Sequence, residues 1–449
     1  MSLIQSIPLR LRPNPARVVV RPLQIAPEPR DLNPVQNERM HRIINGVRAM
    51  EGATVDRELA VILADFGNRH REIRTVFEER FEQVAREVGL ADSLSPPVRQ
   101  LIGAYFCHEY SFGAAALMNP SIVPHPDQNG VPEGGLRFVL SLRAVGEGHI
   151  SSITFREGLI RPCGTIEMAP EPDFAIAARP ETGPGGEVRF TRHVEGMRLD
   201  ETVLFPATPA QRNGLEDLRL VRFTDDDAST CYYGTYTAYS GAAIASELFV
   251  TRDFETFALQ TLTGPAARNK GMALFPRRFG GDYLMIGRQD NESLFLLRSP
   301  DLHHWEEGER IVGPHYPWEL VQMGNCGAPI ELDEGWLVLT HGVGAMRKYT
   351  IGAVLLDRDN PARVIGRSAV PLLSPSDEDR EGYVPNVVYT CGAIAHGGRL
   401  FMPYGVADTS VSFARIEIAD LLAALRAPDA MGSLNDNERE WQGHERIAE

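Results

Sequence analysis

The sequence has few cysteines and no paired metal or disulfide motif. Its 5 cysteines are scattered along 449 residues, and none forms a C-x-x-C pair: Cys107, Cys163, Cys231, Cys326 and Cys391. An odd, scattered set of cysteines argues against a disulfide framework and against a zinc site. We therefore expect no metal, no cofactor and a reducing location, the cytoplasm.

An excess of positive charge and a long apolar run are also lacking. Lys and Arg number 45 against 60 Asp and Glu, which gives a net charge of −15 and argues against nucleic acid as a partner. The first segment, MSLIQSIPLRLRPNP, is interrupted by three prolines, so we expect neither a signal peptide nor a membrane partner. The G-x-G-x-x-G, Walker and G-x-S-x-G motifs are absent as well.

The chain divides into three parts by its pattern. Residues 1–110 predict a Pro- and Arg-rich arm followed by helices, in which apolar residues recur every three or four positions from Met40 to Val47. Thr54 is expected to cap one helix, Gly89 to end another, and Ser95-Pro96-Pro97 to begin a third. Residues 111–428 predict a β domain, and residues 429–449 a polar tail.

The β domain contains a triplet of short strands that is repeated five times. The first strands are NPSIVP, EDLRLV, KGMALFP, GAPIEL and PNVVYT, and each is followed by a second and a third apolar run. The spacing of the first two triplets is wider than the rest, which indicates an insertion between Leu159 and Thr202. Such a repeat is typical of a β-propeller. We predict an all-β five-bladed β-propeller with an N-terminal α-helical extension.

Polar residues recur where the first strands begin and the second strands end. In a propeller these places converge on one axial funnel. At the first strands they are Asn119, Glu216, Asp217, Arg219, Arg268, Asn269, Lys270, Asn325 and Asn386. At the second strands they are Arg143, Arg288, His341, Tyr404 and Asp408. Any one of them could simply tie neighbouring blades together, but the convergence of the whole set favours a functional site.

Two chemistries remain open from these residues alone. The cluster Arg268-Asn269-Lys270, together with Arg288, could cradle an oxyanion, because guanidinium groups match such anions with two hydrogen bonds. The acidic loop before PNVVYT contains Asp379 and Glu381, which could instead supply the second carboxylate that hydrolysis of a glycosidic bond requires.

The chain resembles glycoside hydrolase family 130, the β-mannoside phosphorylases and related β-mannosidases. The resemblance spans roughly Met118 to Leu425 and rests on motifs in order: MNPSI, GLEDLRLV, NKGMALFP, SPDLHHW, GAPIELDEGWLVLTHGV, IGAVLLD, EGYVPNVVYTCG and YGVADTSVSFA. It implies a five-bladed propeller. The helical N-terminal part is an extension relative to shorter members.

The resemblance also implies roles for individual residues. Asp217 matches the proton donor, which in the phosphorylases acts through a substrate hydroxyl, and Asp379 or Glu381 matches the base of hydrolytic members. Two positions depart from the family pattern: Leu218 stands where Pro is usual, and Gln322 stands where phosphorylases carry Lys. The remaining matches are Arg268, Asn269 and Arg288 for phosphate, and His341 and Asp408 for sugar or phosphate.

We therefore predict an inverting enzyme that cleaves β-mannosidic linkages by phosphorolysis, giving α-mannose 1-phosphate. Catalysis is assigned to Asp217, with Asp379 or Glu381 as base if water replaces phosphate. Substrate binding is assigned to Asn119, Arg143, Glu216, Arg219, His341, Asn386 and Asp408, and phosphate binding to Arg268, Asn269, Lys270 and Arg288. The alternatives are a β-mannosidase and a non-catalytic glycan-binding propeller. Expected partners are a small carbohydrate, inorganic phosphate as co-substrate, and a second copy through the helical extension.

Overall fold

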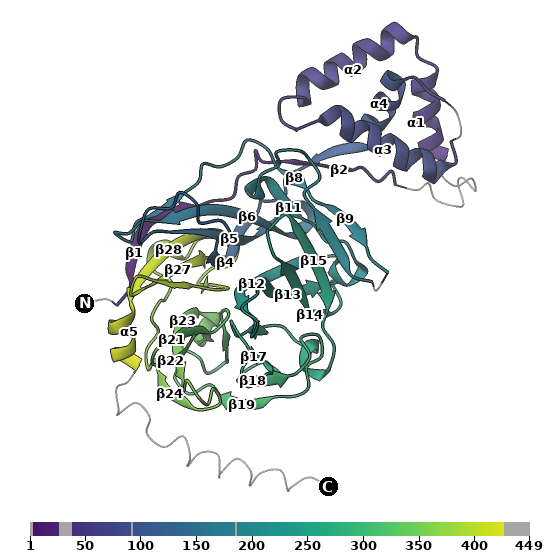
Figure 1. The fold of residues 1–449 in the computed structure, drawn as a ribbon. Coiled ribbons are helices and arrows are strands. Elements are labelled where there is room, and N and C mark those ends of the chain that lie inside the picture. The colour runs from purple at the N-terminus through teal and green to yellow at the C-terminus, as the bar shows by residue number, and fades with distance from the viewer. Residues whose placement is uncertain (1–2, 27–37, 91–92, 185, 426–449) are drawn as a thin grey trace.

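The computed structural model describes residues 3–26, 38–90, 93–184 and 186–425. Figure 1 shows a helical part projecting from a larger part built of sheets. The predicted polar tail, residues 429–449, lies outside the described residues. None of the described helices is both long and apolar enough to cross a membrane.

The helical part contains α1 (Glu38–Arg48), α2 (Gly52–Phe66), α3 (Ile73–Val88) and α4 (Pro96–Tyr105). Gly89 ends α3 with a φ of 70°, and Ser95 with two prolines begins α4, as the sequence predicts. The prediction for Thr54 was wrong, because α2 begins earlier with Glu51 at its N-cap position. A separate apolar core, which includes Ile44, Val84 and Leu101, holds these helices together.

The predicted strand triplets are present as antiparallel sets, with one difference: the predicted first strand of the fourth triplet, GAPIEL, contains β21, and the unpredicted β20 pairs with the same second strand. In chain order they are β4-β5-β6, β12-β13-β14, β16-β17-β18, β20-β22-β23 and β25-β27-β28. Their bounds are Ala116–Pro124, Leu136–Val145 and Ser151–Ile160; Gly214–Thr224, Thr230–Tyr239 and Ile244–Thr251; Ala273–Leu274, Tyr283–Gly287 and Leu294–Ser299; Gln322–Asn325, Gly335–Val343 and Tyr349–Leu356; Val388–Tyr389, Arg399–Val406 and Ser410–Glu417. The alternation between strand and turn along the chain therefore predicted the antiparallel pairing within each triplet but missed β20.

The first two triplets are joined in one sheet of twelve described strands. The join is made where β12 pairs with β6 at Gly214 and Ser151, and where β11 (Thr202–Leu204) pairs with β6. The predicted insertion contributes β7 (Ile166–Met168), β8 (Ile176–Ala177), β9 (Arg179–Thr182) and β10 (Val188–Thr191). Outer strands β15 (Thr256–Thr261), β19 (Glu309–Val312) and β24 (Val364–Arg367) extend three triplets, while β21 (Ile330–Leu332) and β26 (Ile394–His396) pair with second strands.

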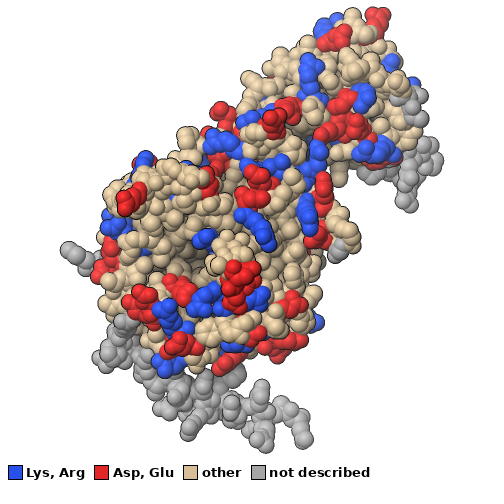
Figure 2. All heavy atoms as spheres, viewed as in Figure 1, with Lys and Arg blue, Asp and Glu red and all other residues tan. Residues whose placement is uncertain are grey.

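The N-terminal arm reaches both parts of the molecule. β1 (Gln5–Leu11) pairs with β28, and β2 (Val19–Pro22) pairs with β3 (Cys107–Tyr110) at the base of the helical part. A short helix, α5 (Ile418–Leu425), follows β28 and packs its leucines into the core of the last two triplets. Lys and Arg side chains are interspersed with Asp and Glu over the face shown in Figure 2.

Two β-bulges orient polar side chains toward the centre of the β part. The register of β4 shifts between Met118 and Ser121, and the register of β12 shifts between Glu216 and Arg219. Within these bulges Asn119 has a φ of 50° and Asp217 a φ of 57°. Asn and Asp tolerate this left-handed conformation better than other non-glycine residues. A bulge redirects a side chain out of the strand's alternation, and here it turns both residues toward the centre of the β part.

Candidate active site

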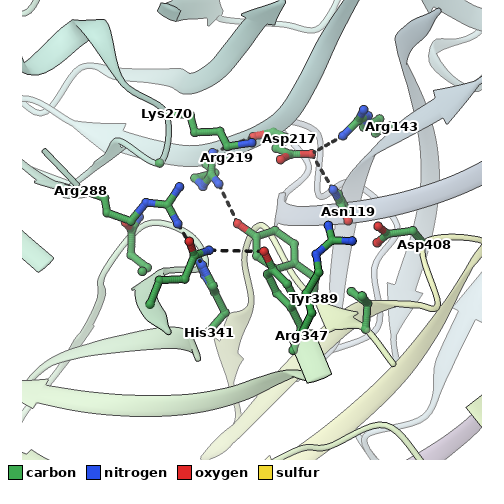
Figure 3. A pocket seen from close by; sticks show the side chains of 16 residues that line it. Asn119, Arg143, Asp217, Arg219, Lys270, Arg288, His341, Arg347, Tyr389 and Asp408 are labelled. Atoms are coloured by element: carbon green, nitrogen blue, oxygen red, sulfur yellow. Dashed lines mark hydrogen bonds and ion pairs between the residues drawn. The ribbon is translucent and has the colours of Figure 1, made fainter. Parts of the chain in front are cut away.

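A pocket of about 190 Å³ lies where the triplets meet, and every triplet or the segment next to it contributes to its wall (Figure 3). Its lining consists of Asn119, Arg143, Asp217, Arg219, Lys270, Gly271, Arg288, Gln322, Gly324, Asn325, His341, Arg347, Tyr349, Val387, Tyr389 and Asp408. Eight of the predicted site residues, those assigned a role from the sequence, are therefore brought together: Asn119, Arg143, Asp217, Arg219, Lys270, Arg288, His341 and Asp408. Asn325, a member of the wider polar set, lines the pocket as well.

Asp217 is the most enclosed carboxylate of the pocket, with 9% of the residue exposed. Its Oδ1 accepts a hydrogen bond from Asn119 Nδ2 at 2.5 Å and one from Arg143 Nη1 at 3.2 Å. Burial alone would raise the pKa of Asp217, but Arg143, Arg219 and Lys270 outweigh it and lower the pKa to about 2. Asp217 is thus ionised at neutral pH.

Glu216, the other half of the predicted acidic pair, lies behind the wall. Its carboxylate accepts a hydrogen bond from Arg143 Nη2 at 2.5 Å, while Arg143 Nε donates to Ser151 Oγ at 2.9 Å. Successive residues of a strand face opposite sides, and the bulge begins at the next residue. Glu216 therefore fixes the guanidinium of Arg143 beside Asp217 without lining the pocket itself.

Arg219 and Arg288 are buried cations without a carboxylate partner among the described residues. Arg219 donates to Tyr389 Oη at 2.8 Å and to the backbone oxygen of Asp217 at 3.1 Å. Arg288, of which 7% is exposed, lies beside His341, with Nη1 and the ring Nε2 3.4 Å apart. Burial lowers the pKa of Arg288, and burial together with Arg288 lowers the pKa of His341 well below its ordinary value. The imidazole is thus neutral, with Nε2 as the acceptor.

The pocket carries net positive charge in a protein whose overall charge is −15. Its lining contains five cationic side chains, namely Arg143, Arg219, Lys270, Arg288 and Arg347, and two carboxylates, Asp217 and Asp408. With His341 neutral, the formal net charge of these lining side chains is +3. A buried guanidinium is costly unless an anion or a set of acceptors accompanies it. The net positive charge of the pocket therefore favours the binding of an anion close to the carboxyl group of Asp217.

Asp408 lies on the opposite side of the pocket from Lys270 and Arg288 in Figure 3. It follows β27 in a left-handed conformation, with a φ of 47°. Burial, reinforced by the negative charge of Asp217, raises the pKa of Asp408 to about 6, although Arg143 and Arg347 oppose the shift. Asp408 is accordingly a carboxyl group whose protonation changes near neutral pH.

Six predicted site residues do not line the pocket. Besides Glu216, they include Asn269, whose Nδ2 donates to the backbone oxygen of Arg288 at 2.9 Å and to Asn291 Oδ1 at 2.7 Å, so that it braces the loop. Arg268 is exposed at the end of the 3₁₀ turn Pro265–Arg268. Asn386 is half-buried just before β25, and its backbone oxygen accepts from Tyr349 N.

Asp379 and Glu381, the predicted bases for hydrolysis, also lie outside the pocket lining. Asp379 accepts a hydrogen bond from Ser376 Oγ at 2.7 Å and lies 3.5 Å from Arg10 Nη1 of β1. Glu381 is exposed. The described residues include no group of three or more His, Cys, Asp or Glu side chains placed to hold a metal ion.

Three polar side chains of the lining were not predicted: Arg347, Tyr349 and Tyr389. Tyr349 Oη lies 3.3 Å from Gln322 Nε2, and its ring stacks 5.9 Å from that of His341. Arg347 occupies the turn between β22 and β23, where Met346 and Arg347 both have left-handed φ values. The equivalent turn of the first triplet has the same conformation at Gly148 and His149. Aligning these turns within the repeat was the available signal for Arg347.

Comparisons with known proteins agree with this architecture. A family profile described as beta-1,4-mannooligosaccharide phosphorylase matches residues 186–427. The beta-1,2-mannobiose phosphorylase of Listeria innocua is 32% identical over 249 residues, which cover 53% of this chain and 68% of that protein. The 1,2-beta-oligomannan phosphorylase of Thermoanaerobacter sp. (strain X514) is 33% identical over 236 residues, or 50% of this chain and 75% of that protein.

A solved structure shares the fold. The Listeria innocua beta-1,2-mannobiose phosphorylase, in complex with beta-1,2-mannobiose, superposes with a TM-score of 0.51 at 22% identity, covering 69% of this chain and 92% of that one. Fold and pocket thus define a β-rich enzyme whose site lies where several sheets meet. The chain belongs to glycoside hydrolase family 130.

Proposed function

We propose that this chain is an inverting β-mannoside phosphorylase that uses inorganic phosphate to release α-mannose 1-phosphate. The observation that carries the proposal is the pair of buried guanidinium groups of Arg219 and Arg288, which have no carboxylate partner among the described residues, with Lys270 lining the same pocket. Phosphate is an anion that would accept hydrogen bonds from these cations and balance their charge, and it can also act as the nucleophile. The named activities of the relatives point the same way.

The reaction follows from that arrangement. A phosphate oxygen attacks the anomeric carbon from the face opposite the leaving sugar, the carbon–oxygen bond to the leaving sugar breaks, and inversion converts the β linkage into an α phosphate. Asp217 delivers the proton to the leaving oxygen, through a substrate hydroxyl as the family resemblance implies. Asn119 and Arg143 hold its carboxyl group in place.

Phosphate also prepares the acid in this scheme. The pKa of Asp217 is low because Arg143, Arg219 and Lys270 surround it with positive charge. Bound phosphate places negative charge beside Lys270 and Arg219, offsets their effect and raises the pKa of Asp217. Proton donation is then coupled to occupation of the anion site, so the acid becomes competent when the nucleophile is present.

We further propose that residues 111–428 form a five-bladed β-propeller and that residues 1–110 form the extension. The five antiparallel triplets in chain order, the pocket to which each of them contributes, and the pairing of β1 with β28 support this architecture. Self-association through the helical extension stays a prediction. The family description names β-1,4 linkages and the two relatives β-1,2 linkages, so the substrates to test include both.

The test is product release from a panel of β-1,2- and β-1,4-linked mannobioses with and without inorganic phosphate. Phosphorolysis predicts that turnover requires phosphate and that α-mannose 1-phosphate accumulates in equal amount to the released sugar. Release of free mannose at the same rate without phosphate would favour the β-mannosidase alternative. Glycan binding without turnover of any member of the panel would favour the non-catalytic one.

A further inference from the structure

Asn325 is a buried amide with no hydrogen-bonding partner at either end. It is the last residue of β20 and only 1% exposed, yet neither Nδ2 nor Oδ1 contacts a donor or acceptor among the described residues. Buried side-chain amides in native proteins normally form hydrogen bonds. A buried amide that forms none within the protein therefore indicates a ligand or water as its partner. Because Asn325 lines the pocket, the missing partner is one that enters there.

The amide faces the cationic side of the pocket. A Cβ atom added to Gly271 would lie 3.9 Å from Asn325 Oδ1 and 3.8 Å from Arg288 Cβ, so the glycine leaves open the space between these two side chains. A Cβ atom on the preceding residue, Gly324, would lie 3.3 Å from Arg288 Cδ and 2.5 Å from His341 Cε1. Asn325 therefore shares its open space with Arg288.

We propose that Asn325 is a ligand of the phosphate ion and makes the site selective for an anion that carries a proton. The proposal rests on the proposed function, in which phosphate binds on this side of the pocket. Nδ2 donates to one phosphate oxygen, as Arg288 and Lys270 do. Oδ1 accepts a hydrogen bond from a P–OH group, which neither Arg nor Lys can do because both are donors only. Sulfate has no proton at neutral pH and leaves Oδ1 unsatisfied.

The first experiment compares wild type with Asn325→Leu, which keeps the approximate size of the side chain and removes both hydrogen-bonding groups. Inorganic phosphate and sodium sulfate are titrated against the full chain without sugar, with the rise in Tm as the readout. Steady-state kinetics with a mannobiose turned over by the wild type then give the KM for phosphate and for sugar. We expect the phosphate Kd and KM to rise roughly tenfold or more, the sugar KM to change less than about twofold, and the preference for phosphate over sulfate to shrink.

Thr340→Val is the matched control. Thr340 pairs with Asn325 across β20 and β22 and is equally buried, but it does not line the pocket. Its phosphate KM should stay that of the wild type. If Asn325→Leu does not fold, Asn325→Asp keeps the shape of the side chain and places a negative charge against the anion, so phosphate affinity should fall, and fall further as the pH rises.

Two results from the variant would overturn the proposal: a folded Asn325 variant with unchanged phosphate affinity, or one in which phosphate and sugar KM rise equally. The titration without sugar separates this proposal from the proposed function, because it measures binding rather than turnover. A wild-type protein that binds phosphate but hydrolyses mannosides would sink phosphorolysis and leave Asn325 as an anion ligand. A wild-type protein whose Tm does not respond to phosphate would sink the Asn325 proposal.

Discussion

The residue at position 217 has to meet two requirements, one set by the backbone conformation and one by the proposed reaction. The bulge in β12 needs a residue that accepts a left-handed conformation, and the proposed reaction needs a carboxyl group. Asp satisfies both, and Asn satisfies only the first. Substituting Asp217 with Asn therefore separates fold from function.

Asp217→Asn should lower kcat by roughly 10² to 10⁴, the range that general acid catalysis contributes, with Tm nearly unchanged. The measurement is turnover of a mannobiose at saturating phosphate, together with thermal unfolding. Asp226→Asn, at an exposed turn between β12 and β13, is the control and should be fully active. A comparably active Asp217→Asn enzyme would transfer the acid role to another carboxyl group.

The family resemblance implies a lysine at the position of Gln322, whose amide lies beside Tyr349. Gln322→Lys adds a cation to the wall near Arg288, so the phosphate KM should fall roughly three- to tenfold. Gln322→Glu adds the opposite charge and should raise it by a similar factor. Steady-state kinetics over a series of phosphate concentrations check that the phosphate KM rises in the order Lys, Gln, Glu at this position. The same phosphate KM in both variants would mean that this residue lies outside the anion site.

Asp408 should make stability depend on pH. Its pKa is raised from 3.8 to about 6 by burial and by Asp217, so the folded state favours the protonated form. The stabilisation is complete below about pH 4 and is lost as the pH rises through 6, which amounts to about 3 kcal/mol for a shift of about two pKa units. Asp408→Asn should therefore be more stable than wild type at pH 7.5, and the difference should vanish near pH 4. Urea unfolding at both pH values measures this, and a difference independent of pH would contradict it.

At the scale of elements, the sequence predicted the strand triplets and the placement of eight pocket residues. Asp217, Arg219 and Lys270 were found because polar residues at the start of an apolar strand stand out against its alternation. Arg347 was missed because two successive non-glycine residues in left-handed conformation are not encoded by local preference. Asp379 and Glu381 lie in an irregular loop, whose path is set by contacts with distant residues such as Arg10.

The helical part is joined to the β part by ion pairs of very different burial. Arg71, between α2 and α3, donates to Glu201 Oε1 at 2.8 Å, and the Glu201 side chain is 2% exposed. Arg179 of β9 contacts Glu79 of α3 at 2.5 Å, but both side chains are more than 40% exposed. Exposed pairs contribute little, whereas removing the partner of a buried carboxylate leaves an uncompensated charge.

Arg71→Met should therefore lower the free energy of unfolding by about 2 kcal/mol, and Arg179→Met by less than about 1 kcal/mol. Urea unfolding followed by circular dichroism measures both in parallel. Neither residue lines the pocket, so the phosphate KM should stay constant in both variants. Equal losses of stability would mean that the burial of Glu201 does not govern the attachment of the helices.

At the scale of the whole molecule, the repeat predicted how many triplets there are but not how they are joined. The pairing of Gly214 with Ser151 merges the first two triplets into one sheet, and nothing in either sequence segment signals such a contact. The sequence predicted an N-terminal arm but not its partners. The arm supplies two strands: β1 pairs with β28, and β2 pairs with β3 beside the helices.

β1 should hold the last sheet in place. It pairs with β28 from Gln5 opposite Arg415 to Leu11 opposite Val411, and it packs Ile7, Leu9 and Leu11 against the core of the first triplet. Deleting residues 1–11 would expose these contacts and the edge of β28. With about 1.5 kcal/mol for each of the three apolar side chains, the loss is about 4.5 kcal/mol, and Tm should fall by roughly 5 to 7 °C.

The same deletion should also weaken catalysis. Tyr389 and Asp408 belong to the sheet of β25, β27 and β28, and both line the pocket. If β1 fixes that sheet, its removal should raise the KM for phosphate and for sugar together, since Tyr389 holds Arg219 while Asp408 faces the other side of the pocket. Leu9→Ala, which keeps the strand, should lower Tm only slightly and leave both KM values unchanged. A truncated chain with wild-type Tm and kinetics would show that β28 keeps its position without β1, and that the arm serves the helical part alone.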